Sequence, residues 1–251
     1  MAIPEGKPFV ARRILVGIDA STASLDALEA AASLAARLGS ELAGLFVEDE
    51  DLLRLAALPF GDIVRSPSGE RERLDRASVE AALRAIASHA REVLERTAAS
   101  HGVMCSFRVA RGRVVHEVLA AAEGVDLLVL GSAGHDRPAR SAVGETARAA
   151  AARAATSVLL LARGARLGDC VVAVDDGTPA GTRAVAAAQR LAREGQPPAI
   201  LCTSSCADLA LLDAVARLGP ALVVLPATAA AAPGGVVDRV LALGVAVLVA
   251  R

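Results

Sequence analysis

The sequence is short of aromatic side chains: it has no Trp, no Tyr and only four Phe among 251 residues. A folded core must therefore be built from Ala, Val, Leu and Ile, and a hydrophobic content of 54% is enough for a sizeable one. Long apolar runs are missing as well, since no stretch reaches about 18 apolar residues without a charge. The first residues, MAIPEGKPFVARR, contain no continuous apolar segment of the kind found in secretory signals. We expect a cytoplasmic protein with no membrane partner.

An excess of charge of one sign is also missing. Lys and Arg number 27 against 28 Asp and Glu, which gives a net charge of −1. This balance gives no reason to expect a nucleic-acid partner. Cysteines are few, and their spacing fits neither a zinc site nor a disulfide framework. We interpret them as buried or idle thiols, because free Cys usually packs as a small hydrophobe. They are Cys105, Cys170, Cys202 and Cys206.

What the sequence does contain is an alternation of strand-like and helix-like segments. The apolar run RRILVGID ends at Asp19, the helical pattern LDALEAAASLAARLG stops at Gly39, and ELAGLFVED follows. Such a β-α-β unit predicts a parallel sheet with right-handed crossovers. Residues 50–70 predict a loop with one short helix, in which LLRLAALPF covers the sheet, or else forms a lid or a docking site. Further strands are predicted over 103–112, 126–131 and 156–163, and further helices over 71–100, 114–124 and 145–155.

The pattern then restarts. Residues 168–195 parallel residues 12–39, with a strand, an Asp, a polar turn, a helix and a Gly in the same order. Residues 207–226 parallel a later part of the first unit, but one long helix and one strand are missing before them. The sequence is therefore an internal repeat, and we predict a second unit with four strands. We place the two units at 1–165 and 166–251.

A glycine-rich stretch, GSAGHDRPARSAVGET, follows the predicted fourth strand at residues 131–146. In a doubly wound sheet, ligands bind beyond the carboxyl ends of the strands, where the strand order reverses. Glycines let a backbone approach a phosphate closely, and the following helix directs its N–H groups at it. The stretch predicts either a phosphate cradle or a plain surface loop. Asp19, at the end of the first strand, could bond a ribose hydroxyl or a base amine.

These features resemble the universal stress protein family. The resemblance covers the whole first half and rests on ILVGIDAS and on the G-x2-G-x9-G spacing of Gly131, Gly134 and Gly144. The chain looks like a tandem member with a shortened, degenerate second domain. The resemblance implies an open, doubly wound parallel α/β sheet of the adenine nucleotide α-hydrolase-like type, with strand order 3-2-1-4-5. It also implies an intrachain pseudo-dimer, paired through the last strands Thr156–Arg163 and Val245–Arg251. A homodimer and an unknown protein partner stay open.

The resemblance further implies a site for ATP or AMP, with Mg²⁺ if the ligand is ATP. Asp19 and the backbone of Ala20 would lie near the adenosine, and Val47 would contact the adenine. Gly131, Gly134 and Gly144 would shape the phosphate loop, with polar contacts from Ser132, His135 and Thr146. No metal ligand within the chain is predicted.

The sequence departs from the family at Glu145, where nucleotide-binding members carry Ser or Thr. An ionised carboxylate cannot donate to a phosphate, and two like charges about 4 Å apart repel by roughly 4 kcal/mol at an effective dielectric near 20. Thr146, Mg²⁺, Arg137 or Arg140 could relieve this repulsion. Alternatively, Glu145 stabilises its helix N-terminus by about 0.3–1 kcal/mol.

The second unit lacks the glycine pattern altogether, and Pro226 stands in place of the first glycine. We therefore expect no nucleotide there. Two main functions follow: a regulatory or stress-response module with an adenine-nucleotide site in the first half, or a nucleotide-free signalling protein in which Glu145 marks a lost phosphate site. An enzyme such as a slow ATPase is the third, and no catalytic residue is predicted. We interpret His89, His101 and His116 as surface residues.

Overall fold

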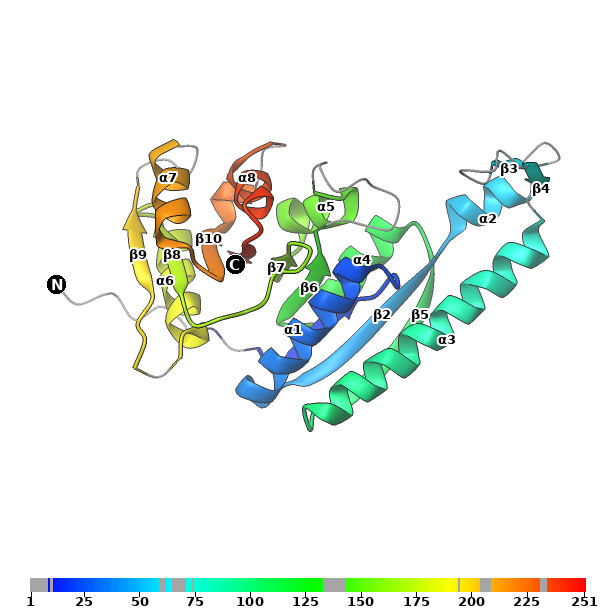
Figure 1. The fold of residues 1–251 in the computed structure, drawn as a ribbon, viewed down its shortest axis with the longest axis horizontal. Coiled ribbons are helices and arrows are strands. Elements are labelled where there is room, and N and C mark those ends of the chain that lie inside the picture. Colours follow the sequence, from blue (N-terminus) through cyan, green and yellow to red (C-terminus); the bar gives the residue numbers. More distant parts are fainter. Residues whose placement is uncertain are drawn as a thin grey trace.

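Nine strands form one continuous sheet in the computed structural model, which describes residues 9, 11–58, 62–64, 71–73, 75–132, 143–193, 195–203, 209–230 and 234–251 (Figure 1). Along the sheet, the strands are β5 (Cys105–Gly112), β2 (Glu41–Asp49), β1 (Arg13–Gly17), β6 (Leu127–Gly131), β7 (Ser157–Leu161), β11 (Ala246–Ala250), β10 (Leu222–Pro226), β8 (Val171–Asp175) and β9 (Ala199–Cys202). The first five of these, numbered along the chain, give the order 3-2-1-4-5. The predicted strand order of the first half is therefore confirmed.

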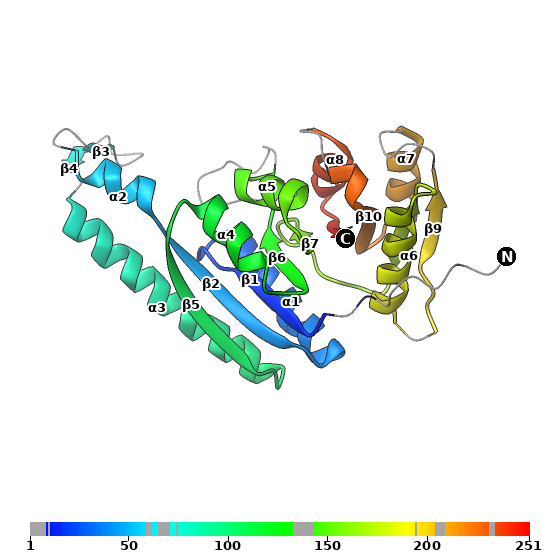
Figure 2. The ribbon, with the colours of Figure 1, turned by 180° about the vertical axis from the view of Figure 1, so that it is seen from behind.

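Helices cover both faces of the sheet in the first half. Helices α1 and α3 contact each other on the face turned forward in Figure 1, and α4 and α5 contact each other on the face turned forward in Figure 2. This arrangement explains why the central strands are apolar along their whole length, since both faces of a covered parallel strand are buried. The helices are α1 (Thr22–Leu38), α2 (Glu50–Ala56), α3 (Arg76–Ser100), α4 (Val114–Ala122), α5 (Glu145–Arg153), α6 (Pro179–Leu191), α7 (Leu209–Leu218) and α8 (Val236–Ala242), with a short 3-10 helix η1 (Ala227–Ala230).

Helix α1 has clear end signals. The side chain of Ser21 accepts a hydrogen bond from the backbone N–H of Ser24 at 3.1 Å, a cap that stabilises a helix by about 1 kcal/mol. The helix ends at Gly39, whose φ of 66° lies in the left-handed region that glycine adopts freely. The capped start of α1 lies directly after β1, so it fixes the loop at the end of that strand.

The prediction for residues 50–100 needs two corrections. The helix predicted from residue 71 begins at Arg76, because residues Arg71–Arg73 form strand β4, which pairs with β3 (Asp62–Val64) as an antiparallel hairpin. The short helix predicted in this region exists as α2, but it covers the core only in part. Leu53 is buried, whereas Leu55 is 57% exposed.

The two halves join along β7 and β11. These strands pair antiparallel, with Leu159 opposite Leu248. The pairing of the two last strands predicted from the sequence is therefore present. The described residues of the second half form four strands in the order β11-β10-β8-β9. Because β7 and β11 run in opposite directions, the carboxyl ends of the strands in the two halves lie at opposite edges of the sheet.

The seam between the halves, where β7 meets β11 and the helices of the two halves meet beside them, is buried, and polar side chains make contacts across it. One hydrophobic core cluster runs through both halves. Nη2 of Arg37 on α1 donates to the carbonyl of Leu191 on α6 at 2.6 Å, and Nε of Arg148 on α5 lies 3.6 Å from Oδ2 of Asp238 on α8. We conclude that the halves share one core rather than two separate ones.

Two further predictions concern cysteines and membranes. Cys105, Cys170 and Cys202 are free, as predicted, but they are exposed rather than buried, and Cys206 lies outside the described residues. None of the helices within the described ranges has the length and apolar character needed to cross a bilayer.

Candidate nucleotide-binding cleft

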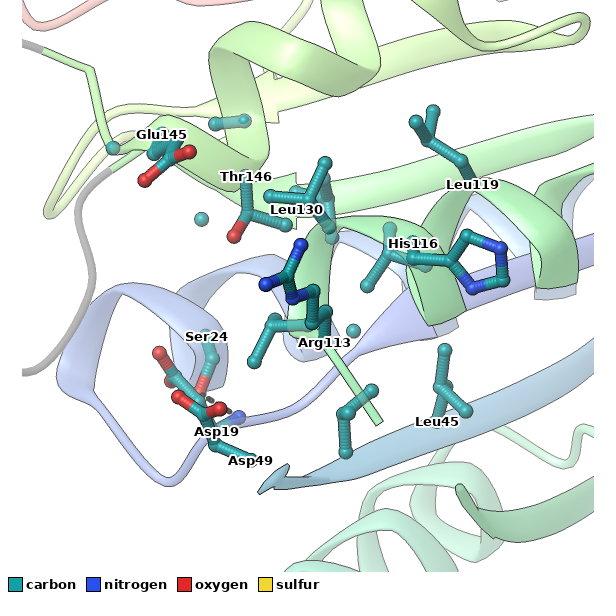
Figure 3. A pocket seen from close by; sticks show the side chains of 18 of the residues that line it. Asp19, Ser24, Leu45, Asp49, Arg113, His116, Leu119, Leu130, Glu145 and Thr146 are labelled. Atoms are coloured by element: carbon teal, nitrogen blue, oxygen red, sulfur yellow. Dashed lines mark hydrogen bonds between the residues drawn. The ribbon is translucent and has the colours of Figure 1, made fainter. Parts of the chain in front are cut away.

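A cleft of about 830 Å³ opens at the carboxyl ends of β1 and β6 (Figure 3). The strand order reverses between these two strands, because β2 and β5 lie on one side and β7 on the other. The paired residues of β1 and β6 extend only to Val16 and Val129, and beyond them the loops separate. This is the place where open α/β sheets bind ligands, and the volume falls within the range of about 300–1,000 Å³ typical of small-molecule sites.

The cleft has an apolar floor. Leu45 and Val47 come from β2, Leu130 from β6, and Val118 and Leu119 from α4. Leu45 and Leu130 belong to the buried core, and Val47 is half-buried. Val47 therefore lies where a flat apolar group, such as a purine ring, could cover it.

A tight turn carries Asp19 to the rim. Oδ1 of Asp19 accepts a hydrogen bond of 2.9 Å from the backbone N–H of Ser21, and the N–H of Asp19 donates to Oγ of Ser24 at 3.4 Å. Between them, Ala20 has a φ of 60°, a left-handed conformation that costs an alanine roughly 1–2 kcal/mol. The second carboxylate oxygen, Oδ2, takes part in none of these bonds.

Gly131 is fixed by packing. A Cβ atom at this position would lie 2.7 Å from the carbonyl carbon and 2.8 Å from the carbonyl oxygen of Ala23. The end of β6 can approach the first turn of α1 this closely only because residue 131 has no side chain. The glycine is therefore required by the fold, whether or not a phosphate binds beside it.

The other wall of the cleft is the start of α5. Gly144 is the N-cap residue and makes no side-chain cap bond, and its N–H donates to the carbonyl of Ser132 at 2.6 Å. Glu145 is the first residue of the helix and is exposed, while Thr146 is half-buried. The acidic residue therefore stands at the positive end of the helix dipole, which is a favourable place for it when no phosphate is present.

The cleft brings together most of the predicted site residues that the structure describes. Its lining includes Asp19, Val47, Gly131, Gly144, Glu145 and Thr146. Ala20 and Ser132 are not part of the lining, and Ser132 is buried with 8% exposure. Gly134 and His135 lie outside the described residues, as do Arg137 and Arg140.

Five ionisable residues of the lining were not predicted from the sequence. They are Asp49 at the end of β2, Asp51 in α2, Arg113 and His116 at the start of α4, and Arg153 at the end of α5. Asp49 could have been found, because residues two apart on a strand face the same side and Val47 was already assigned. His116, interpreted as a surface residue, is indeed 78% exposed, but it lies at the mouth of the cleft.

Among the described residues, the rim of the cleft carries more acidic than basic side chains. Four carboxylates belong to the described lining, namely Asp19, Asp49, Asp51 and Glu145. Two guanidiniums, those of Arg113 and Arg153, belong to the same described lining. No group of three or more His, Cys, Asp or Glu side chains within the described ranges is arranged to hold a metal ion. The surplus of carboxylates among the described lining residues disfavours a highly charged polyphosphate more than a ligand of small negative charge.

In the second half, a hydrogen bond joins the two loops that correspond to those around the cleft. Thr228 in η1, directly after β10, donates from its hydroxyl to Oδ2 of Asp176 at 2.8 Å, and Thr178 donates to Oδ1. Partial burial alone would raise the pKa of Asp176, but these hydrogen bonds outweigh it and hold the pKa below its ordinary value. The loops after β8 and β10 therefore bond to each other at the position where the first half has its cleft.

Comparison with known proteins agrees with this fold. The chain resembles a universal stress protein from Archaeoglobus fulgidus DSM 4304 at a TM-score of 0.68 and 14% identity, over 96% of this chain and 98% of that chain. A functionally unknown protein from Pseudomonas aeruginosa PAO1 gives a TM-score of 0.55 and 18% identity, over 96% and 92% of the two chains. At these identities, the likeness concerns the fold alone. A search of curated proteins found no match.

The fold and the cleft define an open α/β protein with a ligand-sized crevice where its strand order reverses. The model of the universal stress protein family matches residues 11–162. This is more than half of the chain, and the protein belongs to that family. The match covers the first half, from before β1 to the end of β7.

Proposed function

We propose that this protein is a regulatory module that binds one adenine nucleotide, ATP or AMP, in the cleft of its first half. The observation that carries the proposal is the convergence of three elements on one crevice. The loop after β1 supplies Asp19, β2 supplies Val47, and the start of α5 supplies Thr146. An apolar floor beside polar side chains is the arrangement that orients small ligands.

Each group in the cleft suits one part of the ligand. The free oxygen of Asp19 can accept a hydrogen bond from a ribose hydroxyl, because an ionised carboxylate only accepts. Val47 offers an apolar surface to the base. The N–H groups and the dipole at the start of α5 favour an anion. Within the described part of the second half, Thr228 bonds to Asp176 and joins the two corresponding loops, so we assign one site per chain.

Filling the cleft tests this proposal. Val47→Phe places a ring over the apolar floor on a strand where Phe is well tolerated. We expect it to abolish the binding of AMP and ATP in equilibrium dialysis. Val109→Phe is the matched control, because Val109 lies on neighbouring β5, is 41% exposed and does not line the cleft. Equal binding by both variants would place the nucleotide elsewhere, and equal binding of a guanine nucleotide by the native chain would argue against an adenine site.

One observation favours a second function, a nucleotide-free interaction module. Glu145 is exposed at the first residue of α5, where a phosphate would lie. The alternative predicts that the native chain binds no nucleotide and that Glu145→Ser creates ATP binding. Glu92→Gln on the exposed side of α3 removes the same charge outside the cleft lining and serves as the control. ATP binding by the native chain would contradict the alternative.

A further inference from the structure

Arg113 occupies a special position at the mouth of the cleft. It is the N-cap residue of α4 and follows directly on the end of β5. Its side chain reaches into the cleft, where Figure 3 shows it among the labelled residues between Asp19 and Thr146. It is 71% exposed, and its recorded partner is Asp51, with Nε 3.7 Å from Oδ2. This long contact leaves most of its five N–H donors available.

Arg111, the neighbouring arginine on β5, is held much more closely by the fold. Arg111 on β5 binds Glu48 on β2 through two nitrogens, Nη2 at 2.7 Å and Nε at 2.8 Å. Glu48 is buried with 8% exposure, and its hydrogen bond raises the pKa of Arg111. Arg111 therefore fastens β5 to β2 and does not line the cleft. Nothing comparable in the described contacts fastens Arg113 to the fold.

The cleft has two chemically distinct ends. Arg113, Thr146 and the start of α5 line the same cleft, so a guanidinium, a hydroxyl and the N–H groups of a helix N-terminus can all donate to one ligand there. The carboxylates of Asp19 and Asp49 lie at the other end. A ligand that matches both ends carries one anionic group and, some distance away, hydroxyl or amine donors.

We propose that Arg113 binds the phosphate of a nucleoside monophosphate and thereby selects a single phosphate over a longer chain. This assignment rests on the proposed function and names the ligand class of the same site. A guanidinium can bind two oxygens of one phosphate at once. Glu145 and Asp51 line the same cleft, and Oδ2 of Asp51 lies 3.7 Å from Nε of Arg113. Each further phosphate would add negative charge to a cleft that already contains these two carboxylates, so the affinity falls from AMP to ATP.

The experiment compares adenosine, AMP and ATP, each without and with Mg²⁺, by calorimetric titration of the full chain. The native protein should bind AMP more tightly than adenosine and more tightly than ATP without Mg²⁺. Arg113→Gln should weaken AMP about 10- to 100-fold, the usual value of a charge-assisted hydrogen bond, and leave adenosine unchanged. Arg108→Gln removes an exposed charge of β5 outside the cleft lining and should change neither.

The outcomes separate this assignment from the function on which it rests. If neither adenosine nor AMP binds, the adenine site itself is wrong. If adenosine and AMP bind equally, or if ATP without Mg²⁺ binds more tightly than AMP, the site exists but the selection for one phosphate is wrong. An AMP preference that persists in Arg113→Gln and disappears in Arg137→Gln or Arg140→Gln would assign the phosphate to those sequence positions and overturn the role of Arg113.

Discussion

The hydroxyl of Thr228 donates a 2.8 Å hydrogen bond to Oδ2 of Asp176 and so joins the loop after β10 to the loop after β8. The equivalent loops of the first half, after β6 and β1, border the cleft instead. The two halves therefore differ at the place where an open α/β sheet binds ligands, although their strands follow a similar order. This difference is the structural reason for assigning one site to the chain.

The Asp176–Thr228 bond makes a prediction about pH. The pKa of Asp176 is held below its ordinary value of 3.8 in the folded protein, so its contribution to stability is present above that value and is lost as the pH falls through the folded pKa. Thr228→Val should raise the pKa of Asp176 and lower the free energy of unfolding by about 1 kcal/mol at pH 7.

The measurement is denaturant unfolding at pH 7 and at pH 2.5. The difference between native and variant should become smaller at the lower pH, because the stability that depends on the Asp176 carboxylate is lost as this group takes up a proton. Thr228→Ser keeps the hydroxyl and should behave like the native protein. A destabilisation by Thr228→Val that is the same at both pH values would mean that packing of the methyl group, rather than the bond to the carboxylate, is lost.

The backbone conformation of the turn after β1 predicts that a glycine at position 20 stabilises the protein. Ala20 has a φ of 60°, and in the second half Gly177 takes a similar φ of 75° directly before its helix. Ala20→Gly should raise the free energy of unfolding by up to about 1 kcal/mol, because the strain of left-handed alanine outweighs the added flexibility of the unfolded chain. Gly177→Ala should have the opposite sign and a cost of about 1 kcal/mol, since nothing lies within 4 Å of its added Cβ. Two changes of the same sign would contradict the backbone argument.

A side chain at position 131 is predicted to destabilise the folded protein. Gly131→Ala should lower the free energy of unfolding by about 1–3 kcal/mol, because the new Cβ would overlap the backbone of Ala23. Gly124→Ala, whose Cβ meets nothing within 4 Å, should stay within about 0.5 kcal/mol of the native protein. Thermal denaturation of both variants decides the point. If Gly131→Ala folds with native stability, the close approach of β6 to α1 is not needed.

The seam between the halves predicts cooperative unfolding. Leu248 on β11 is fully buried opposite Leu159 on β7, so Leu248→Ala should cost about 2–5 kcal/mol. Leu243 is 49% exposed, and Leu243→Ala should change stability by less than about 0.5 kcal/mol. Calorimetry should show one transition for the native chain and one, at lower temperature, for Leu248→Ala. Two separate transitions in the native chain would show that the halves do not depend on the shared core.

The strand order could be predicted because strand and helix periods alternate cleanly along the chain. The apolar runs that end at Asp19 and Gly131 are β1 and β6, and both reach the same edge of the sheet. The hairpin of β3 and β4 could not be predicted, since the residues of β4, Arg71–Arg73, read as the continuation of the charged helix behind them. Charged residues at such spacing fit either structure, and only pairing with β3 decides between them.

The residues of the candidate site that belong to a sequence pattern were predicted. The residues that reach the cleft only through the spatial arrangement of the strands were missed. Asp19 and Thr146 stand in recognisable patterns, and the cleft contains both. Arg113 and Asp51 have no motif. They reach the cleft because β2 and β5 continue past the end of β1 as a pair, which carries the following segments up beside it. The length of that extension cannot be deduced from composition or spacing alone.

The most direct test of the account is to count AMP sites by calorimetric titration of the native chain. One site per chain, with an affinity in the micromolar range and no competition from a guanine nucleotide, is the predicted result. The absence of binding at millimolar AMP would contradict it and leave Glu145 as the mark of a lost phosphate site. Two sites per chain would contradict it differently, because the loops joined by Asp176 and Thr228 would then have to open.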